Sequence, residues 1–251
     1  MTQTSSEYIK ENFVFNYAMF ILDSVGFGSA FALLIPLSYT PDVAFEISGA
    51  WFAAPSVIIM FYFLNIFGQF ISSSNRKKEE DSKLDVIKWG ILERLGFVLI
   101  YLTLNYFLDS SLILVFFLIT YGIFVYSSGA ILPAYFDLVS RVLYKHRAIF
   151  FAANLTTGSL AGFLVSRYVD FRIQEKGLVE GFSDGLLVVI AITSLSLIPL
   201  ILIKEPKGIS QNKKKLNLAI IKNKFNDWYE IYRNSKDVRA IALSNIVIVA
   251  V

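Results

Sequence analysis

Long apolar runs dominate this sequence and limit what it can fold into. No charged residue falls between positions 47 and 71, and a helix that crosses a bilayer needs about 20 mostly apolar residues. Further runs of this kind lie at 13–38, 112–136, 148–166 and 186–203. A sixth run, at 86–108, is interrupted near its start by Lys88, Glu93 and Arg94. The pattern predicts an all-α integral membrane protein whose residues 1–203 form a six-helix transmembrane bundle.

The composition agrees with a membrane protein and offers little for catalysis. Charged residues make up 17% of the chain, against about 25% in soluble domains. Cysteine is absent, and the single histidine, His146, lies in a polar loop. Neither a thiolate or histidine metal site nor a serine–histidine couple is therefore expected in the bilayer. No G-x-x-x-x-G-K-[ST] phosphate loop occurs either, and we expect no enzyme activity, metal or cofactor.

Basic residues are divided unevenly between the two ends of the predicted bundle. Of the 23 Lys and Arg residues, only Arg167, Arg172 and Lys176 fall on the side opposite the N-terminus. Cytoplasmic loops carry the excess of Lys and Arg in membrane proteins, so the N-terminus is predicted to be cytoplasmic in a multi-pass protein of the cell membrane. The same rule accounts for the basic loops without a nucleic-acid partner.

The C-terminal part of the chain is predicted to leave the bundle. Residues 204–238 are too polar to span and form a cytoplasmic linker. Within it, Ile221, Phe225, Trp228 and Tyr232 share one face of a helix, which predicts an amphipathic helix lying at the membrane surface or packed on the bundle. Residues 239–251 are apolar again but too short to cross alone, so we expect the start of a truncated seventh helix.

Asp23 is the first candidate functional residue, because a carboxylate in the middle of a span is costly unless it faces protein or water. Asn16 and Phe27 share its helix face. One interpretation is a substrate- or proton-binding group in a central cavity lined by these three residues. The other is a structural aspartate bonded to a neighbouring helix.

Charged residues near the ends of two other spans suggest a gate. Adjacent helical positions point about 100° apart, so Glu93 and Arg94 are not expected to pair with each other. Asp137 and Arg141 are predicted to lie at the same depth. We therefore expect these four residues to form one charge network at the cytoplasmic mouth, or else to be separate charges that reach the interface.

Several glycines lie where helices are expected to turn or to approach one another. Gly68 and Asn75 border the basic loop after the second span and suit tight backbone geometry. In the fifth span, Gly158 and Gly162 have the spacing that allows close helix packing. Asn154, one turn before Gly158, is placed to line either a cavity or that helix contact.

These features resemble the N-terminal six-helix half of the major facilitator superfamily. The signature of that family between its second and third helices runs G-x-L-A-D-R-x-G-R-K. The matching positions here are Gly68, Phe70, Asn75, Arg76 and Lys77. Ser72 and Ser73 stand where the family has Asp and Arg, so the gate-latching role of that Asp is moved or missing.

Two further segments carry the resemblance. Residues 133–137 followed by 145–148 are similar to the family's passage from its fourth to its fifth helix, with Arg147 at the usual basic position, and 204–207 resembles its exit from helix six. The G-x-x-x-G-P mark of antiporters is incomplete, because Phe163 follows Gly162. The gate candidates that follow from the network and the resemblance together are Gly68, Asn75, Arg76, Lys77, Glu93, Arg94, Asp137, Arg141 and Arg147.

The resemblance implies a secondary transporter that moves a small solute, with a proton as a candidate coupling ion, across the bilayer by alternating access. It also implies a partner half of six helices that this chain lacks. A seven-helix receptor or retinal protein and the permease subunit of an ATP-driven importer are the alternatives. A retinal protein needs a Schiff-base lysine in its last span, and residues 240–251 contain none.

Overall fold

The chain folds into long α-helices joined by short turns. The structure is a computed structural model, which describes residues 5–75, 82–143 and 145–206. All regular secondary structure within these ranges is helical. The expected amphipathic helix around Trp228 and the expected seventh helix at 239–251 lie outside them, as do Arg76 and Lys77.

The helices are α1 (Ser5–Glu11), α2 (Phe13–Leu34), α3 (Thr40–Ser48), α4 (Ala53–Asn75), α5 (Ser82–Tyr106), α6 (Ile113–Val142), α7 (Arg147–Lys176) and α8 (Leu178–Leu202). Five of them, α2, α4, α6, α7 and α8, are long and apolar enough to cross a membrane. This agrees with a multi-pass membrane protein. α5 is as long as α8, but its charged residues make it less apolar than these five helices.

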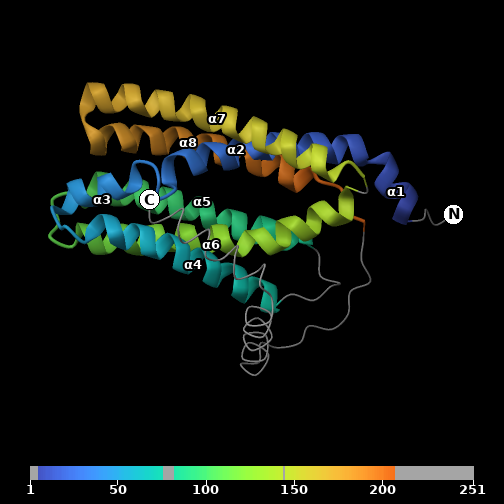
Figure 1. The fold of residues 1–251 in the computed structure, drawn as a ribbon, viewed down its shortest axis with the longest axis horizontal. Helices are drawn as coiled ribbons and strands as arrows, with labels where there is room; N and C mark the ends of the chain where they lie inside the picture. The colour runs from blue at the N-terminus through green and yellow to red at the C-terminus, as the bar shows by residue number, and fades with distance from the viewer. Residues whose placement is uncertain (1–4, 76–81, 144, 207–251) are drawn as a thin grey trace, which may run out of the picture.

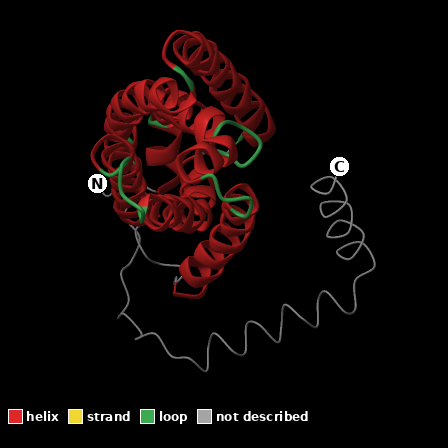
Figure 2. Cartoon of the chain, turned by 90° about the vertical axis from the view of Figure 1, so that its left-hand side faces the viewer, coloured by secondary structure: helices red, strands yellow, loops and turns green. Residues whose placement is uncertain are grey.

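The long helices run side by side in one bundle, with their connections alternating between its two ends (Figure 1). α2 packs against α7 and α8, while α6 packs against α4 and α5. Contact between α5 and α8 joins these two groups of helices. The short α3 covers one end, where it contacts α4, α6 and α8. Figure 2 shows the bundle from the end at which α3 lies.

The observed helix ends differ from the predicted spans in two places. The predicted span at 47–71 is divided, because Gly49 adopts a left-handed conformation (φ 63°) that ends α3, and the spanning helix begins only at Ala53. The predicted loop at 167–185 is helical except around Gly177. The charges that suggested this loop are neutralised on the helices themselves, since Arg172 and Lys176 both pair with Asp184, at 2.5 and 2.9 Å.

Close approach of helices depends on glycine at two crossings. A Cβ atom on Gly162 would lie 2.8 Å from the carbonyl oxygen of Gly28, and one on Gly28 would meet the backbone of Gly158. The expected close packing through Gly158 and Gly162 is therefore present between α2 and α7. At the second crossing, between α4 and α6, a Cβ on Gly68 would meet Ala130 N at 3.0 Å.

Two apolar clusters fill the two ends of the bundle. The first, with Leu33, Val43 and Phe182, lies at the end covered by α3. The second, with Phe20, Leu138 and Phe150, lies at the end where α7 begins. Buried polar side chains from α2, α5, α6 and α8 occupy the level between the clusters. This polar level contains the candidate site.

Candidate functional site

A cavity of about 360 Å³ lies between the two apolar clusters. Helices α2, α5, α6, α7 and α8 all contribute to its wall. The lining residues are Asp23, Ser24, Phe27, Ala30, Val86, Gly90, Glu93, Arg94, Ser128, Ile131, Leu132, Tyr135, Phe136, Phe151, Asn154, Leu155, Thr193 and Leu200. Most of the wall is hydrocarbon or aromatic, and the charged groups belong to only three side chains. Pockets that bind small molecules commonly combine an apolar wall with a few polar groups in this way.

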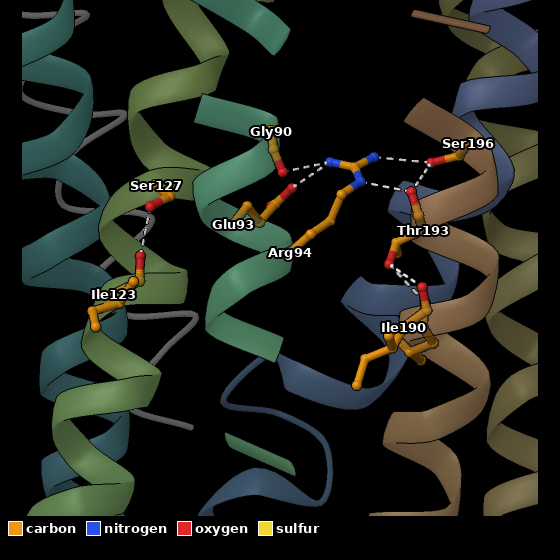
Figure 3. Close-up of polar contacts among 9 residues, drawn as sticks. Gly90, Glu93, Arg94, Ile123, Ser127, Ile190, Thr193 and Ser196 are labelled. Carbon is orange, nitrogen blue, oxygen red and sulfur yellow. Dashed lines mark hydrogen bonds and ion pairs between the residues drawn. The ribbon is translucent and has the colours of Figure 1, made fainter. Parts of the chain in front are cut away.

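Arg94 crosses from α5 to α8 and is held by acceptors of the protein itself (Figure 3). Its Nε donates to the carbonyl oxygen of Thr193 at 2.6 Å, and its Nη2 donates to Ser196 Oγ at 3.0 Å. Its Nη1 donates to the carbonyl oxygen of Gly90 at 2.8 Å. A Cβ on Gly90 would lie only 3.1 Å from Nη1. Glycine at this position therefore leaves room for the guanidinium group.

Glu93 forms an ion pair with Arg94, at 3.6 Å between Oε2 and Nη1. Both side chains are largely buried, with 12% and 13% of their surface exposed. Ser128 on α6 lines the same cavity as Glu93. The expectation that these neighbours do not pair is thus wrong. Their Cβ atoms diverge as expected, but the long Arg94 side chain turns back along α5 toward Gly90, which brings its Nη1 to Glu93.

Asp23 faces this pair from α2 and is only 8% exposed. Arg94 lines the same cavity, and the hydroxyl of Ser196, which accepts from Arg94, donates to the carbonyl oxygen of Thr193 at 2.9 Å. A Cβ on Gly26 would collide with the Ser196 side chain, so glycine one turn after Asp23 lets α8 approach α2 here. Ser196 therefore lies at the contact between α2 and α8, where it accepts a hydrogen bond from Arg94.

Of the other binding candidates, Phe27 and Asn154 line the cavity, and Asn16 does not. Asn154 Nδ2 is 3.2 Å from the hydroxyl oxygen of Tyr135, to which it donates. Asn16 is 1% exposed, and its amide is paired in both directions with the main chain of Lys204, at 2.9 and 2.8 Å. Asn16 thus ties the start of α2 to the segment after α8.

The four expected gate charges form two groups rather than one network. Arg141 Nη2 pairs with Asp137 Oδ2 at 2.8 Å, and Ser82 Oγ donates to the same carboxylate at 2.5 Å. Ser82 begins α5, and Glu93 lies eleven residues later on that helix, about 16 Å along its axis at 1.5 Å per residue. Glu93 and Arg94 therefore lie at the cavity, and Asp137 and Arg141 lie at the end of the bundle.

Glu205 joins the Asp137–Arg141 group at the end of the bundle. Its carboxylate is 3.6 Å from Arg141 Nη1 and accepts hydrogen bonds from the backbone N–H groups of Ser82 and Lys83, at 3.3 and 3.0 Å. A carboxylate placed at a helix N-terminus satisfies donors that have no partner within the helix. This group holds together the start of α5, the end of α6 and the segment that follows α8.

The remaining gate candidates are placed as follows. Gly68 lies inside α4 at the crossing with α6, so it serves helix packing rather than the expected turn. Asn75 is the last residue of α4. Arg147 begins α7 and donates to the carbonyl oxygens of Leu143 and Ser140, at 2.9 and 2.8 Å, which satisfies the end of α6.

Sequence reasoning missed several polar residues that line the cavity, namely Ser24, Ser128, Tyr135 and Thr193, and it also missed Ser196, which accepts from Arg94. Serine and threonine are common in membrane helices, where the hydroxyl often donates to the helix backbone. Thr193 does so here, to the carbonyl oxygen of Val189 at 2.7 Å. Nothing in the sequence separates such residues from cavity residues. Among the residues that the structure describes, no cluster of His, Cys, Asp or Glu has the make-up of a metal site.

Comparison of the chain with protein-family models, with curated proteins and with solved structures gives no match.

Proposed function

We propose that this chain is part of a secondary transporter that moves a small solute through the cavity by alternating access. The observation that carries the proposal is the set of three charged side chains, Asp23, Glu93 and Arg94, enclosed at the middle of an apolar helical bundle. Ionisable residues at membrane depth are costly and usually mark a substrate or ion pathway. The two apolar clusters above and below the cavity would then form the barriers that open in turn.

The helix contacts support a bundle of two equivalent three-helix repeats. Exchanging α2 with α6, α4 with α7 and α5 with α8 turns the α2–α7 contact into α6–α4 and the α2–α8 contact into α6–α5. The contact between α5 and α8 maps onto itself, whereas the α7–α8 contact has no comparable counterpart between the described parts of α4 and α5. The glycine crossings also correspond, since Gly28 meets α7 on one side and Gly129 meets Asn65 of α4 on the other. Transporter folds are often built from such repeats, with the binding site where the repeats meet.

This arrangement supports our proposal of a six-span bundle resembling the N-terminal half of the major facilitator superfamily. α5 is then the sixth span, and Glu93 and Arg94 are tolerated within it because they face the cavity and α8 instead of lipid. The N-terminus would be cytoplasmic in the cell membrane, since Arg167, Arg172 and Lys176 all lie toward the opposite end of the bundle. A second six-helix half would complete the transport path.

Transport by purified protein in liposomes tests the proposal. A pH-sensitive dye inside the vesicles would report proton movement when small amines, amino acids, sugars or carboxylates are added outside. We expect at least one solute class to drive proton movement, and Asp23→Asn to abolish it while leaving the reconstituted amount unchanged. Asp42→Asn is the matched control, because Asp42 is an exposed carboxylate on α3, away from the cavity. Undiminished transport by Asp23→Asn would exclude Asp23 as the coupling or binding group.

A further inference from the structure

Acidic side chains outnumber basic ones in the wall of the cavity, and this composition points to the kind of solute that the cavity accepts. Two carboxylates, Asp23 and Glu93, face one guanidinium group, that of Arg94. From the geometry of these three groups we infer that the cavity binds a monovalent organic cation with an apolar body, and that the cationic group lies against Asp23. This inference rests on the proposed function, because it names the substrate class of the same cavity.

Arg94 is already engaged by the protein. Each of its three guanidinium nitrogens donates to an acceptor of α5 or α8, at 2.6 to 3.0 Å, and Nη1 also faces Glu93. An anionic solute would have to replace these contacts, which are charge-assisted and therefore among the stronger hydrogen bonds. Arg94 thus serves as a counter-charge inside the bundle, and its guanidinium group has no nitrogen left without an acceptor that could bind an anion.

Asp23 is the carboxylate whose charge is less completely compensated. Glu93 has a direct ion pair with Arg94, whereas Asp23 has no ion pair within 4 Å among the residues that the structure describes. A charge enclosed among apolar groups gains more from an opposite charge than it would in water, because the effective dielectric constant is low. A cationic group beside Asp23 would therefore be stabilised, and it would bring the three charged side chains and the solute to neutrality.

The rest of the wall suits a hydrocarbon or aromatic body. Phe27, Phe136 and Phe151 line the cavity together with aliphatic side chains, and the rings of Phe136 and Phe151 are 5.9 Å apart. Aromatic faces also attract cations. A sugar would need many hydrogen-bonding partners that this wall does not provide. The volume of about 360 Å³ lies in the range of pockets for small organic molecules.

A pair of ligands with the same shape and opposite charge tests the inference. Benzyltrimethylammonium is the cation and phenylmethanesulfonate the anion, and both have one phenyl ring and a compact charged group. Saturable binding of each to the full-length protein in detergent would be measured by equilibrium dialysis. We expect the cation to bind at least about tenfold more tightly than the anion. Equal or tighter binding of the anion, or no saturable binding of the cation, would overturn the inference.

Two variants locate the cation. Asp23→Asn keeps the shape of the side chain and removes its charge, so it is expected to weaken cation binding at least about tenfold, while Asp42→Asn leaves it unchanged. Unchanged cation binding in Asp23→Asn would place the ligand elsewhere and overturn the assignment. If Asp23→Asn fails to fold, as judged by gel filtration, the comparison of the two ions on the unmodified protein still tests whether the cavity prefers a cation.

The liposome assay separates this inference from the proposed function. Cation binding that depends on Asp23, without movement of any solute, would support the site and exclude the transporter. Movement of a sugar or carboxylate that depends on Asp23, without cation binding, would support the transporter and exclude the organic cation as its substrate.

Discussion

Ionised side chains inside a membrane protein are costly unless the protein supplies partners for them. This rule identifies Asp23 from the sequence as a candidate cavity residue, whereas Glu93 and Arg94 are expected from the sequence at the cytoplasmic mouth and lie instead at the cavity. The rule does not predict the partners of Arg94 on α8, far along the chain. Ser196 is the clearest case, since it accepts a hydrogen bond from Arg94 but looks in the sequence like any serine of an apolar span. Asn154, by contrast, has both a cavity position and a polar partner.

Replacement of Arg94 is expected to destabilise the bundle, because it leaves two buried carboxylates without their counter-charge. We expect Arg94→Gln to lower the free energy of unfolding by about 3 kcal/mol. The exposed Arg167→Gln is the control and should change it by less than about 0.5 kcal/mol. The measurement is unfolding by titration with a denaturing detergent.

The ion pair between Glu93 and Arg94 predicts that substitutions of these two residues have coupled effects on the free energy of unfolding. Because removal of both charges leaves only Asp23, the double variant with Glu93→Gln and Arg94→Gln should be more stable than Arg94→Gln alone. Additive losses from the two substitutions would contradict the ion pair seen in the structure. The same double-variant comparison for Arg94 and Asp137 should show no coupling, since their groups lie at different levels of the bundle.

At the scale of helices, apolar runs predict how many long helices the described chain contains better than they predict where each begins and ends. The run at 47–71 carries no mark of the break at Gly49, where a left-handed glycine ends α3. α7 and α8 extend beyond their predicted spans because Arg172 and Lys176 find a common partner, Asp184. A count of charges along the sequence does not predict such ion pairs between helices.

Glycine crossings give a prediction at this scale. Gly28→Ala should lower the free energy of unfolding by about 2 kcal/mol, because its methyl group would meet the backbone of Gly158, which cannot turn aside. Gly122→Ala is the matched control within another long helix. Its methyl group would meet only the ends of Met60 and Leu64, at 3.1 and 3.2 Å, which can move. Equal stability of the two variants would contradict the close contact between the backbones of α2 and α7 at Gly28 and Gly158.

At the scale of the whole molecule, the charge distribution supports the orientation that we propose for the bundle. Lys83, Arg141 and Lys204 lie near the end where α5 begins and α6 and α8 finish, and Arg172 and Lys176 lie near the other. The second group is neutralised by Asp184 and Glu175, which leaves the basic excess at one end only. Basic residues resist translocation, so the end with the excess should remain inside the cell.

Single cysteines test this orientation, because the chain has no cysteine of its own. Asp109→Cys places a thiol at the exposed turn between α5 and α6, and Ser73→Cys places one on the exposed last turn of α4, at the opposite end. An impermeant maleimide added to intact cells should label the thiol at position 109 and leave that at position 73 unlabelled until the cells are opened. The reverse pattern would invert the topology.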